Sequence, residues 1–388
     1  MSGGAGELEQ LANLLGGGSL NARLAGKRRD PLVPGHARQL SRRHESGRKG
    51  EGMIDLLDRP LRDLRISVTD RCNLRCGYCM PREAYGPSYA FLPRSELLSF
   101  EEITRLARVL AGQGVEKLRL TGGEPLLRRD LERLVEMLVT VEGIREVALT
   151  TNGLLLAAKA QALADAGLSR ITVSLDALDD DSLRAMSDTA ISAARVLAGI
   201  DAATAAGLDP VKVNMVVRRG VNEQCVLAMA ERFRHRPQIL RFIEYMDVGS
   251  TNGWSSEEVL PAGEILATIA ERWPLERLAP THVGEVATRY RYRDGGGEIG
   301  LIHSVSEPFC ASCSRARLSA DGKLFTCLFA RRGHDLRALL RDGSSDAEIA
   351  KQTLAIWSAR IDRYSADRAL RAEVVAEPAK VEMSYIGG

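Results

Sequence analysis

Short apolar runs alternate with longer segments of helical spacing from Leu64 to about residue 249. The apolar runs predict strands over residues 65–69, 117–120, 146–150, 170–175, 211–217 and 239–245. The segments between them predict helices over residues 100–113, 129–141, 156–166, 182–206 and 223–234. Strands that alternate with helices indicate an α/β fold with a parallel sheet. Six such units favour a partial (β/α)6, TIM-like barrel over a full barrel of eight, and a doubly wound open sheet is the alternative.

The pattern divides the 388 residues into three parts. Residues 1–52 hold glycine runs and a basic patch, so we expect a flexible N-terminal extension, with Met53 as another candidate start and a transit peptide as the alternative. Residues 53–249 carry the barrel pattern. Residues 250–388 lack that pattern, are rich in turns, and include a predicted helix over 347–357, so we expect a smaller C-terminal domain.

The chain has seven cysteines, and six of them form two tight groups that indicate metal binding. These groups are Cys72, Cys76 and Cys79, and Cys310, Cys313 and Cys327. Three neighbouring thiolates cannot all pair as disulfides, and they suit an iron–sulfur cluster with one iron free of protein ligands. Buried structural cysteines are the alternative at the first group. Zinc is the alternative at the second group, where it would need a fourth ligand such as His303 or His334.

Composition and charge exclude several classes of function. The chain is 45% hydrophobic and 27% charged, as in globular proteins, with no apolar run long enough to span a bilayer. Its formal net charge of +2 gives no reason to expect a nucleic-acid partner. Grouped cysteines without a secretory signal indicate a reducing compartment, and we expect a cytoplasmic protein. The seventh cysteine, Cys225, stands alone on a predicted helix and we interpret it as a core residue.

Polar and glycine motifs follow the predicted strands, and the carboxyl ends of parallel strands meet at one ligand-binding rim. These motifs are Thr121-Gly-Gly-Glu-Pro125, Thr150-Thr-Asn-Gly153, Ser174-Leu-Asp176 and Glu244-Tyr-Met246. We expect Gly122 and Gly123 to let the backbone approach a ligand, and Glu124 to accept hydrogen bonds from a cationic amine. Lys212, on the fifth strand, is expected to face an anion at the same rim. Ordinary turns and an edge lysine are the alternatives.

Two further features lie in the C-terminal part. Arg315 and Arg317 would point to the same side of a strand, where two planar guanidinium groups could bind a phosphate or another oxyanion. A solvated pair of arginines is the alternative. The terminal Gly387 and Gly388 could enter a narrow site that any side chain would block, and a frayed end is the alternative.

The chain resembles the radical S-adenosylmethionine enzymes, whose C-x3-C-x2-C motif matches the first cysteine group. Within that superfamily it is similar to the GTP 3′,8-cyclases of molybdenum cofactor biosynthesis, from about residue 62 to residue 388. The second cysteine group, the Arg315-Ala316-Arg317 insert and the Gly-Gly end carry this narrower resemblance. The resemblance implies a radical S-adenosylmethionine barrel whose mouth is closed by a C-terminal iron–sulfur domain.

The resemblance also implies two 4Fe–4S clusters and S-adenosyl-L-methionine as cofactors. The first cluster would be held by Cys72, Cys76 and Cys79, and the second by Cys310, Cys313 and Cys327. The implied contacts of S-adenosylmethionine are Tyr78, Gly123, Ser174 and Met246. The implied contacts of GTP are Arg65, Arg119, Thr150, Lys212, Arg315, Ala316 and Arg317. Arg315, Arg317, Gly387 and Gly388 would take part in catalysis.

The implied reaction is that of a lyase. A 5′-deoxyadenosyl radical takes the ribose 3′ hydrogen of GTP, and the C3′ radical then attacks C8 of guanine. The implied partners are GTP, a one-electron reductant and a downstream cyclic pyranopterin monophosphate synthase, and a homodimer could form. Another two-cluster radical enzyme, such as a peptide maturase, is one alternative, although a peptide has no triphosphate for the arginines to bind. A non-catalytic iron–sulfur or zinc protein is the other, and the Gly-rich turn argues against it.

Overall fold

The computed structural model of the chain describes residues 52–371 and 379–388, so the predicted extension over 1–52 lies almost wholly outside the described residues. One sheet organises them, in the strand order β12-β11-β10-β1-β2-β3-β4-β5-β6-β9-β8-β7. Its centre is a run of parallel strands: β1 (Asp63–Ser67), β2 (Lys117–Thr121), β3 (Glu146–Thr151), β4 (Arg170–Ser174), β5 (Val211–Val217) and β6 (Ile239–Glu244).

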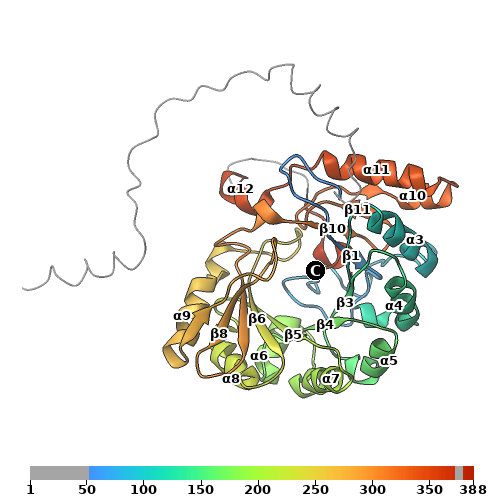
Figure 1. Cartoon of the computed structure of the whole chain (residues 1–388). Helices are drawn as coiled ribbons and strands as arrows, with labels where there is room; N and C mark the ends of the chain where they lie inside the picture. The colour runs from blue at the N-terminus through green and yellow to red at the C-terminus, as the bar shows by residue number, and fades with distance from the viewer. Residues whose placement is uncertain (1–51, 372–378) are drawn as a thin grey trace, which may run out of the picture. The chain divides into compact units, whose positions relative to one another are not determined.

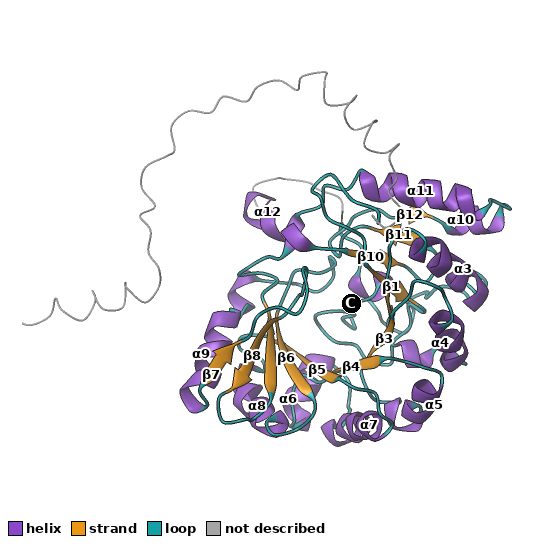
Figure 2. Cartoon of the chain, in the orientation of Figure 1, coloured by secondary structure: helices purple, strands orange, loops and turns teal. Residues whose placement is uncertain are grey.

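These strands neighbour one another in chain order, which confirms the partial barrel and decides against the doubly wound sheet. A doubly wound sheet reverses its order at a switch point, and β1 to β6 show no reversal. Figures 1 and 2 show the strands around an interior, with the helices outside. No ladder joins β7 to β12 among the described residues, so hydrogen bonds do not close the barrel there.

The connecting helices confirm most of the predicted pattern. They are α3 (Phe100–Ala111), α4 (Leu131–Val139), α5 (Ala160–Asp165), α6 (Asp180–Ser187), α7 (Ala193–Ala205) and α8 (Val226–Phe233). The 3-10 turns η1 (Pro125–Leu127), η2 (Leu156–Ala158) and η3 (Glu223–Cys225) precede α4, α5 and α8. The expected capping box is present at α3, where Ser99 Oγ accepts from Glu102 N and the Glu102 carboxylate accepts from Ser99 N.

The single helix predicted over residues 182–206 is wrong, because the structure has α6 and α7 there. Asp188 ends α6 in the left-handed conformation, with φ of 43°, and its N–H donates to Arg184 O. Asp180 then accepts a 2.9 Å hydrogen bond from Ala193 N at the start of α7. The apolar spacing continues through the break, so periodicity alone does not reveal it.

The strands alternate between an apolar outer face and a polar inner face. In β1, Leu64 and Ile66 are fully buried beneath the helices, whereas Asp63 and Arg65 face the interior of the barrel and line its cavity. In β5, Lys212 and Asn214 occupy the inner positions in the same way. The inner face of the barrel is therefore available for ligand binding.

Residues after 249 extend the sheet at both of its edges. Beside β6 lie β9 (Glu298–Ile302), β8 (Thr288–Tyr292) and β7 (Leu275–Arg277). Beside β1 lie β10 (Arg315–Leu318), β11 (Lys323–Phe325) and β12 (His334–Asp335). Since β10 runs parallel to β1, Arg315 is paired with Asp63 and Arg317 with Arg65. The second cysteine group and the arginines are thereby brought beside the first strand of the barrel, and the domain boundary at 249 stays a prediction.

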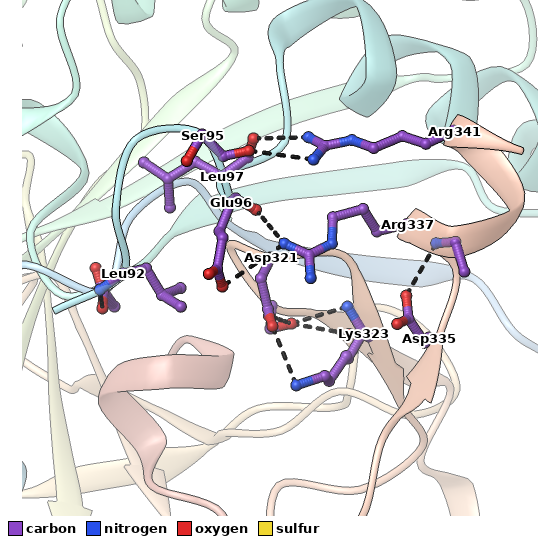
Figure 3. A network of polar contacts seen from close by, with 12 residues as sticks. Leu92, Ser95, Glu96, Leu97, Asp321, Lys323, Asp335, Arg337 and Arg341 are labelled. Carbon is purple, nitrogen blue, oxygen red and sulfur yellow. Dashed lines mark hydrogen bonds and ion pairs between the residues drawn. The ribbon is translucent and has the colours of Figure 1, made fainter.

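Further helices complete the C-terminal part: α9 (Ala262–Arg272), α10 (Arg337–Arg341), α11 (Asp346–Ser358), α12 (Tyr364–Arg371) and α13 (Met383–Ile386). The 3-10 turns there are η4 (Ser256–Glu258) and η5 (Cys310–Ser312). Arginines of α10 fasten this part to the segment after the first cysteines, since Arg337 donates to Glu96 O at 2.9 Å and Arg341 to Ser95 O at 3.1 Å (Figure 3). Among residues 52–371 and 379–388, no helix is long and apolar enough to cross a membrane.

Candidate active site

A cavity of about 1010 Å³ fills the interior of the barrel, and nearly all the predicted site residues line it. Those that line it are Arg65, Cys72, Cys76, Tyr78, Cys79, Arg119, Gly123, Thr150, Ser174, Lys212, Met246, Cys310, Cys313, Arg315, Arg317, Cys327 and Gly388. Ala316 and Gly387 do not line it, and Ala316 is fully buried between the two arginines. The fold thus gathers two cysteine groups far apart in the sequence around one space.

The first cysteine group follows β1 on a loop held by backbone hydrogen bonds. Cys76 O accepts from Cys79 N at 2.9 Å and from Met80 N at 2.8 Å, and Cys72 Sγ accepts from Leu74 N at 3.4 Å. Burial raises the pKa of Cys72 to about 11 and raises that of Cys76 well above its usual value. A bound metal reverses this preference, because a coordinated thiol is deprotonated.

The turn after β2 packs on that loop, and its glycines permit the close contact. Gly123 N donates to Thr69 O at 2.8 Å, and Glu124 N donates to Arg71 O at 2.8 Å. A Cβ atom at Gly123 would collide with the carbonyl of Arg71. The close approach that Gly123 permits is therefore to the backbone of the cysteine loop, although Gly123 also lines the cavity.

Glu124 lines the cavity and also accepts hydrogen bonds within the protein, and the expected bond to a cationic amine stays a prediction. Its oxygens accept from Leu126 N at 2.9 Å, Thr151 Oγ1 at 2.7 Å and Asn152 N at 2.7 Å. Burial raises the pKa of Glu124 to about 7 even though these hydrogen bonds act to lower it. The carboxylate ties the turn after β2 to the turn after β3, and so shapes the rim beside the first cysteines.

Tyr78 is positioned by Asp176, a residue that follows β4. The Tyr78 hydroxyl donates to Asp176 Oδ2 at 2.9 Å, and Asp176 Oδ1 accepts from Val216 N of β5 at 2.9 Å. Burial raises the pKa of Asp176 to about 6. The cysteine loop is thereby connected across the cavity mouth to β4 and β5.

The second cysteine group lies on η5 and on the segment after β11. Arg315 Nη2 donates to Cys313 Sγ at 3.2 Å. Burial alone would raise the pKa of Cys313, but the guanidinium groups of Arg315 and Arg360 outweigh it and lower the pKa to about 6. A cysteine favoured as its thiolate is suited to ligate iron.

The two groups fit clusters better than single metal ions. Across the described part of the chain, no three His, Cys, Asp or Glu side chains converge closely enough to hold one ion. Each cysteine of a four-iron cluster binds a different iron, so the sulfurs of such a site do not converge on one point. Of the two histidines that could complete a zinc site, His334 is exposed on β12, whereas His303 Nδ1 contacts Glu307 at 3.1 Å and its Nε2 is buried without a hydrogen-bond partner among the described residues.

Cationic side chains line the cavity between the two groups, and some of them were missed from the sequence. Those on β1, β2, β4, β5, β6 and β10, here called the cationic set, are Arg65, Lys117, Arg119, Arg170, Lys212, Arg241, Arg315 and Arg317. Lys117, Arg170 and Arg241 are the additions, and charged residues at alternate positions of buried strands are the signal that could have found them. The Nε groups of Arg65 and Arg119 are buried and have no hydrogen-bond partner among the described residues.

These cations destabilise one another in the absence of a ligand. Burial and neighbouring cations lower the pKa of Lys117 to about 8, of Lys212 to about 7 and of Arg241 to about 9. Lys212 is the second residue of β5, so its expected place at the carboxyl rim is wrong and it lies near the amino end of the strand. The cationic set therefore reaches deep into the barrel, where a polyanion would relieve the repulsion.

The last residues of the chain enter the same space, and Figure 1 shows the C-terminus inside the ring of strands. Gly388 lines the cavity, and Arg317 Nη1 donates to Gly387 O. Gly387 has a φ of 78°, and a Cβ atom there would collide with Thr121 Oγ1. Glycine at this position is required both by the backbone conformation and by the space available.

Comparisons with known proteins agree with this arrangement. The profile of the Radical SAM superfamily matches residues 66–233, and that of Molybdenum Cofactor Synthesis C matches residues 238–366. A GTP 3′,8-cyclase of Acidothermus cellulolyticus is 55% identical over 356 residues, which cover 86% of this chain and 98% of that protein. A GTP 3′,8-cyclase of Staphylococcus aureus strain MRSA252 is 48% identical over 339 residues, covering 87% and 99%.

Among solved structures, Streptococcus suis SuiB bound to S-adenosylmethionine is similar in fold. The TM-score is 0.54 at 14% sequence identity, and the match covers 85% of this chain and 72% of SuiB. At this identity the likeness concerns the fold alone.

Proposed function

Because the chain belongs to the family of GTP 3′,8-cyclases, we propose that it converts GTP to (8S)-3′,8-cyclo-7,8-dihydroguanosine 5′-triphosphate. This is the first step of molybdenum cofactor biosynthesis. The observation that carries the proposal is the single cavity, which is lined by both cysteine groups and by cations between them. Its volume is at the upper end of ligand pockets, which suits two ligands at once.

The proposed cofactors are two 4Fe–4S clusters and S-adenosyl-L-methionine. Cys72, Cys76 and Cys79 would hold the first cluster, and Cys310, Cys313 and Cys327 the second. Three cysteines leave one iron of each cluster open to a ligand. When bound, the first cluster and S-adenosylmethionine supply a 5′-deoxyadenosyl radical. Tyr78, Gly123, Ser174 and Met246 line the part of the cavity that we assign to S-adenosylmethionine.

We assign the cationic set, apart from Arg315 and Arg317, to the triphosphate of GTP. Arginine and lysine bind phosphate oxygens through charge-assisted hydrogen bonds, and Arg65 and Arg119 each have a buried donor without a partner in the described structure. Lys212 would gain a counter-charge from the same ligand. Anchoring the triphosphate orients the ribose toward the first cysteine group, and orientation is the contribution that a protein makes when a cofactor supplies the chemistry.

The remaining residues would place the guanine and exclude water. Arg315 and Arg317 lie on the wall that holds the second cysteine group, so they are suited to the guanine end of the nucleotide. Thr150 supports Arg119 through a 3.2 Å hydrogen bond. Gly387 and Gly388 extend the backbone into the cavity without side chains, where they would limit the space open to water.

The proposal extends to partners and location. The reaction needs a one-electron reductant, and its product would be consumed by a cyclic pyranopterin monophosphate synthase. A homodimer is one assembly we expect. A reducing compartment is required to keep six grouped cysteines available to iron, which supports a cytoplasmic location.

Mass analysis of products tests the proposed function. The reconstituted chain is incubated without oxygen with S-adenosylmethionine, GTP and a strong reductant. We expect 5′-deoxyadenosine together with a GTP isomer of unchanged mass. Formation of 5′-deoxyadenosine with unaltered GTP would show that the chain cleaves S-adenosylmethionine but does not convert GTP. This result would overturn the proposed substrate.

A further inference from the structure

Three buried charges lie behind the second cysteine group: Asp55, Arg59 and Arg360, here called the charge triad. Arg59 Nε donates to Asp55 Oδ2 at 2.7 Å, and Arg360 Nη1 contacts the same oxygen at 3.2 Å. The side chains of all three are 1% exposed or less. Fully buried ionised groups are costly unless they are paired and fully hydrogen-bonded, so this triad needs an explanation.

Both arginines of the charge triad bind the backbone of the second cysteine group. Arg59 Nη1 donates to Cys310 O at 2.8 Å, and Arg360 Nη1 donates to Cys313 O at 2.8 Å. Asp55 holds Arg59 from its own turn, since Asp55 Oδ1 accepts from Arg59 N at 2.9 Å. A segment from the start of the described chain and one after α11 thus hold the carbonyl of Cys310, the first residue of η5, and that of Cys313, which follows η5.

The charge triad is not neutral in itself. Two guanidinium groups face one fully buried carboxylate. A second carboxylate, Asp362, lies 3.5 Å from Arg360 Nε but is about one-third exposed, so solvent screens its charge. Arg59 Nη2 is buried and has no hydrogen-bond partner in residues 52–371 and 379–388. An anionic group beside Cys310 and Cys313 would supply the missing compensation.

We propose that the charge triad positions the second cysteine group and sets the reduction potential of the cluster held there. The proposal rests on the proposed function for the presence of that cluster. The potential of an iron–sulfur cluster depends on the net charge and hydrogen bonding around it. Added positive charge stabilises the reduced, more negative cluster and raises its potential, and added negative charge lowers it. Asp55, Arg59 and Arg360 are positioning residues here, because they act through the cysteines.

Variants of opposite charge separate this role from a purely structural one. The full chain with Cys72, Cys76 and Cys79 replaced by alanine retains only the second site, and the potential of its cluster is measured by spectroscopic redox titration. Arg360→Gln removes a positive charge and should lower the potential. Asp55→Asn removes the negative charge with little change in shape and should raise it. Arg59→Gln, beside Cys310, should lower the potential as Arg360→Gln does.

Two controls complete the experiment. Arg360→Lys keeps the charge but loses the planar fork, so its potential should lie nearer that of the unaltered triad. Arg128→Gln removes another arginine that donates to backbone carbonyls, at Val68 and Leu98, and should leave the potential unchanged. Shifts of the same sign in Asp55→Asn and Arg360→Gln, or no shift at unchanged iron content, would overturn the inference. An absence of iron at the second site of the parent chain would instead count against the proposed function.

Discussion

The protonation of Lys212 is expected to change when GTP binds. Burial first, then Arg241, Arg170, Lys117 and Arg119, lower its pKa to about 7 in the free site. A bound triphosphate favours the charged form, so GTP binding must restore the proton at higher pH. GTP affinity should fall as pH rises through 7, by about tenfold for each unit above it. Equilibrium GTP binding between about pH 6.5 and 8.5, without S-adenosylmethionine, measures this dependence.

Lys212→Arg is the matched control for that prediction. A guanidinium stays protonated over the whole range, so the variant should lose most of the decline. The ionisation of GTP itself affects both proteins equally and cancels in the comparison. Equal slopes for the two proteins would show that Lys212 does not meet the triphosphate.

Arg317 should be required for GTP binding but not for forming either cluster. It lines the cavity on β10, donates to Gly387 O and pairs with no carboxylate in the described part of the chain. Hydrogen bonds to charged groups contribute about 1.5–3 kcal/mol, so Arg317→Ala should weaken GTP binding by about 10- to 100-fold. Cleavage of S-adenosylmethionine and iron content should persist. Arg291→Ala, at an exposed ion pair on β8, is the control that should bind GTP normally.

The sequence identified most of these side chains but not what several of them contact. Cysteine spacing and the alternation of a strand are local properties, so the six cysteines and the shared face of Arg315 and Arg317 could be predicted. Glu124 could not be assigned, because its partners Thr151 and Asn152 come from the next strand. Gly123 approaches the cysteine loop rather than acting only toward a ligand, and this contact appears only in three dimensions.

The C-terminal segment around α13 is held by side-chain contacts of Glu382, just before the helix, and of Tyr385, near its end. Glu382 accepts from Ser250 N at 2.9 Å and from Thr251 Oγ1 at 3.0 Å. Tyr385 donates to Asp321. Asp321 also pairs with Lys323 at 3.1 Å, as Figure 3 shows. These contacts indicate a fixed segment rather than a frayed end.

Removal of Gly387 and Gly388 should lower turnover to GTP-derived product while leaving iron content and the unfolding temperature unchanged. The anchors of α13 remain in that truncation, so only the part inside the cavity is lost. Glu382→Gln is the companion variant, which weakens the anchor but keeps both glycines and should reduce turnover less. Full activity of the truncated chain would mean that the end of the chain has no part in the reaction.

Most strands and helices of the barrel could be predicted from local sequence patterns, whereas helix breaks and strand pairing could not. Periods of two and of 3.6 residues revealed β1 to β6 and the helices between them, because each element buries one face. The break between α6 and α7 begins at Asp188, whose left-handed conformation no periodicity marks, and it ends at Ala193, whose N–H donates to Asp180. The pairing of β10 with β1 joins residues about 250 positions apart, and such register cannot be read from a local pattern.

The arrangement of the barrel predicts how much iron the chain binds. Both cysteine groups line one cavity, and each is suited to a four-iron cluster, so we expect about eight iron atoms for each reconstituted chain. Replacing Cys310, Cys313 and Cys327 with alanine should halve this number and leave cleavage of S-adenosylmethionine intact. About four irons together with bound zinc in the unaltered chain would contradict the prediction of a second four-iron cluster.

In the proposed reaction, one cavity holds the ribose of GTP within reach of the radical formed at the first cysteine group. GTP labelled with deuterium at ribose C3′ tests it most directly, because the label marks the atom that the radical removes. Anaerobic turnover with S-adenosylmethionine and a strong reductant should transfer the deuterium into 5′-deoxyadenosine, as detected by mass spectrometry. Unlabelled 5′-deoxyadenosine alongside GTP that keeps its deuterium would contradict the account.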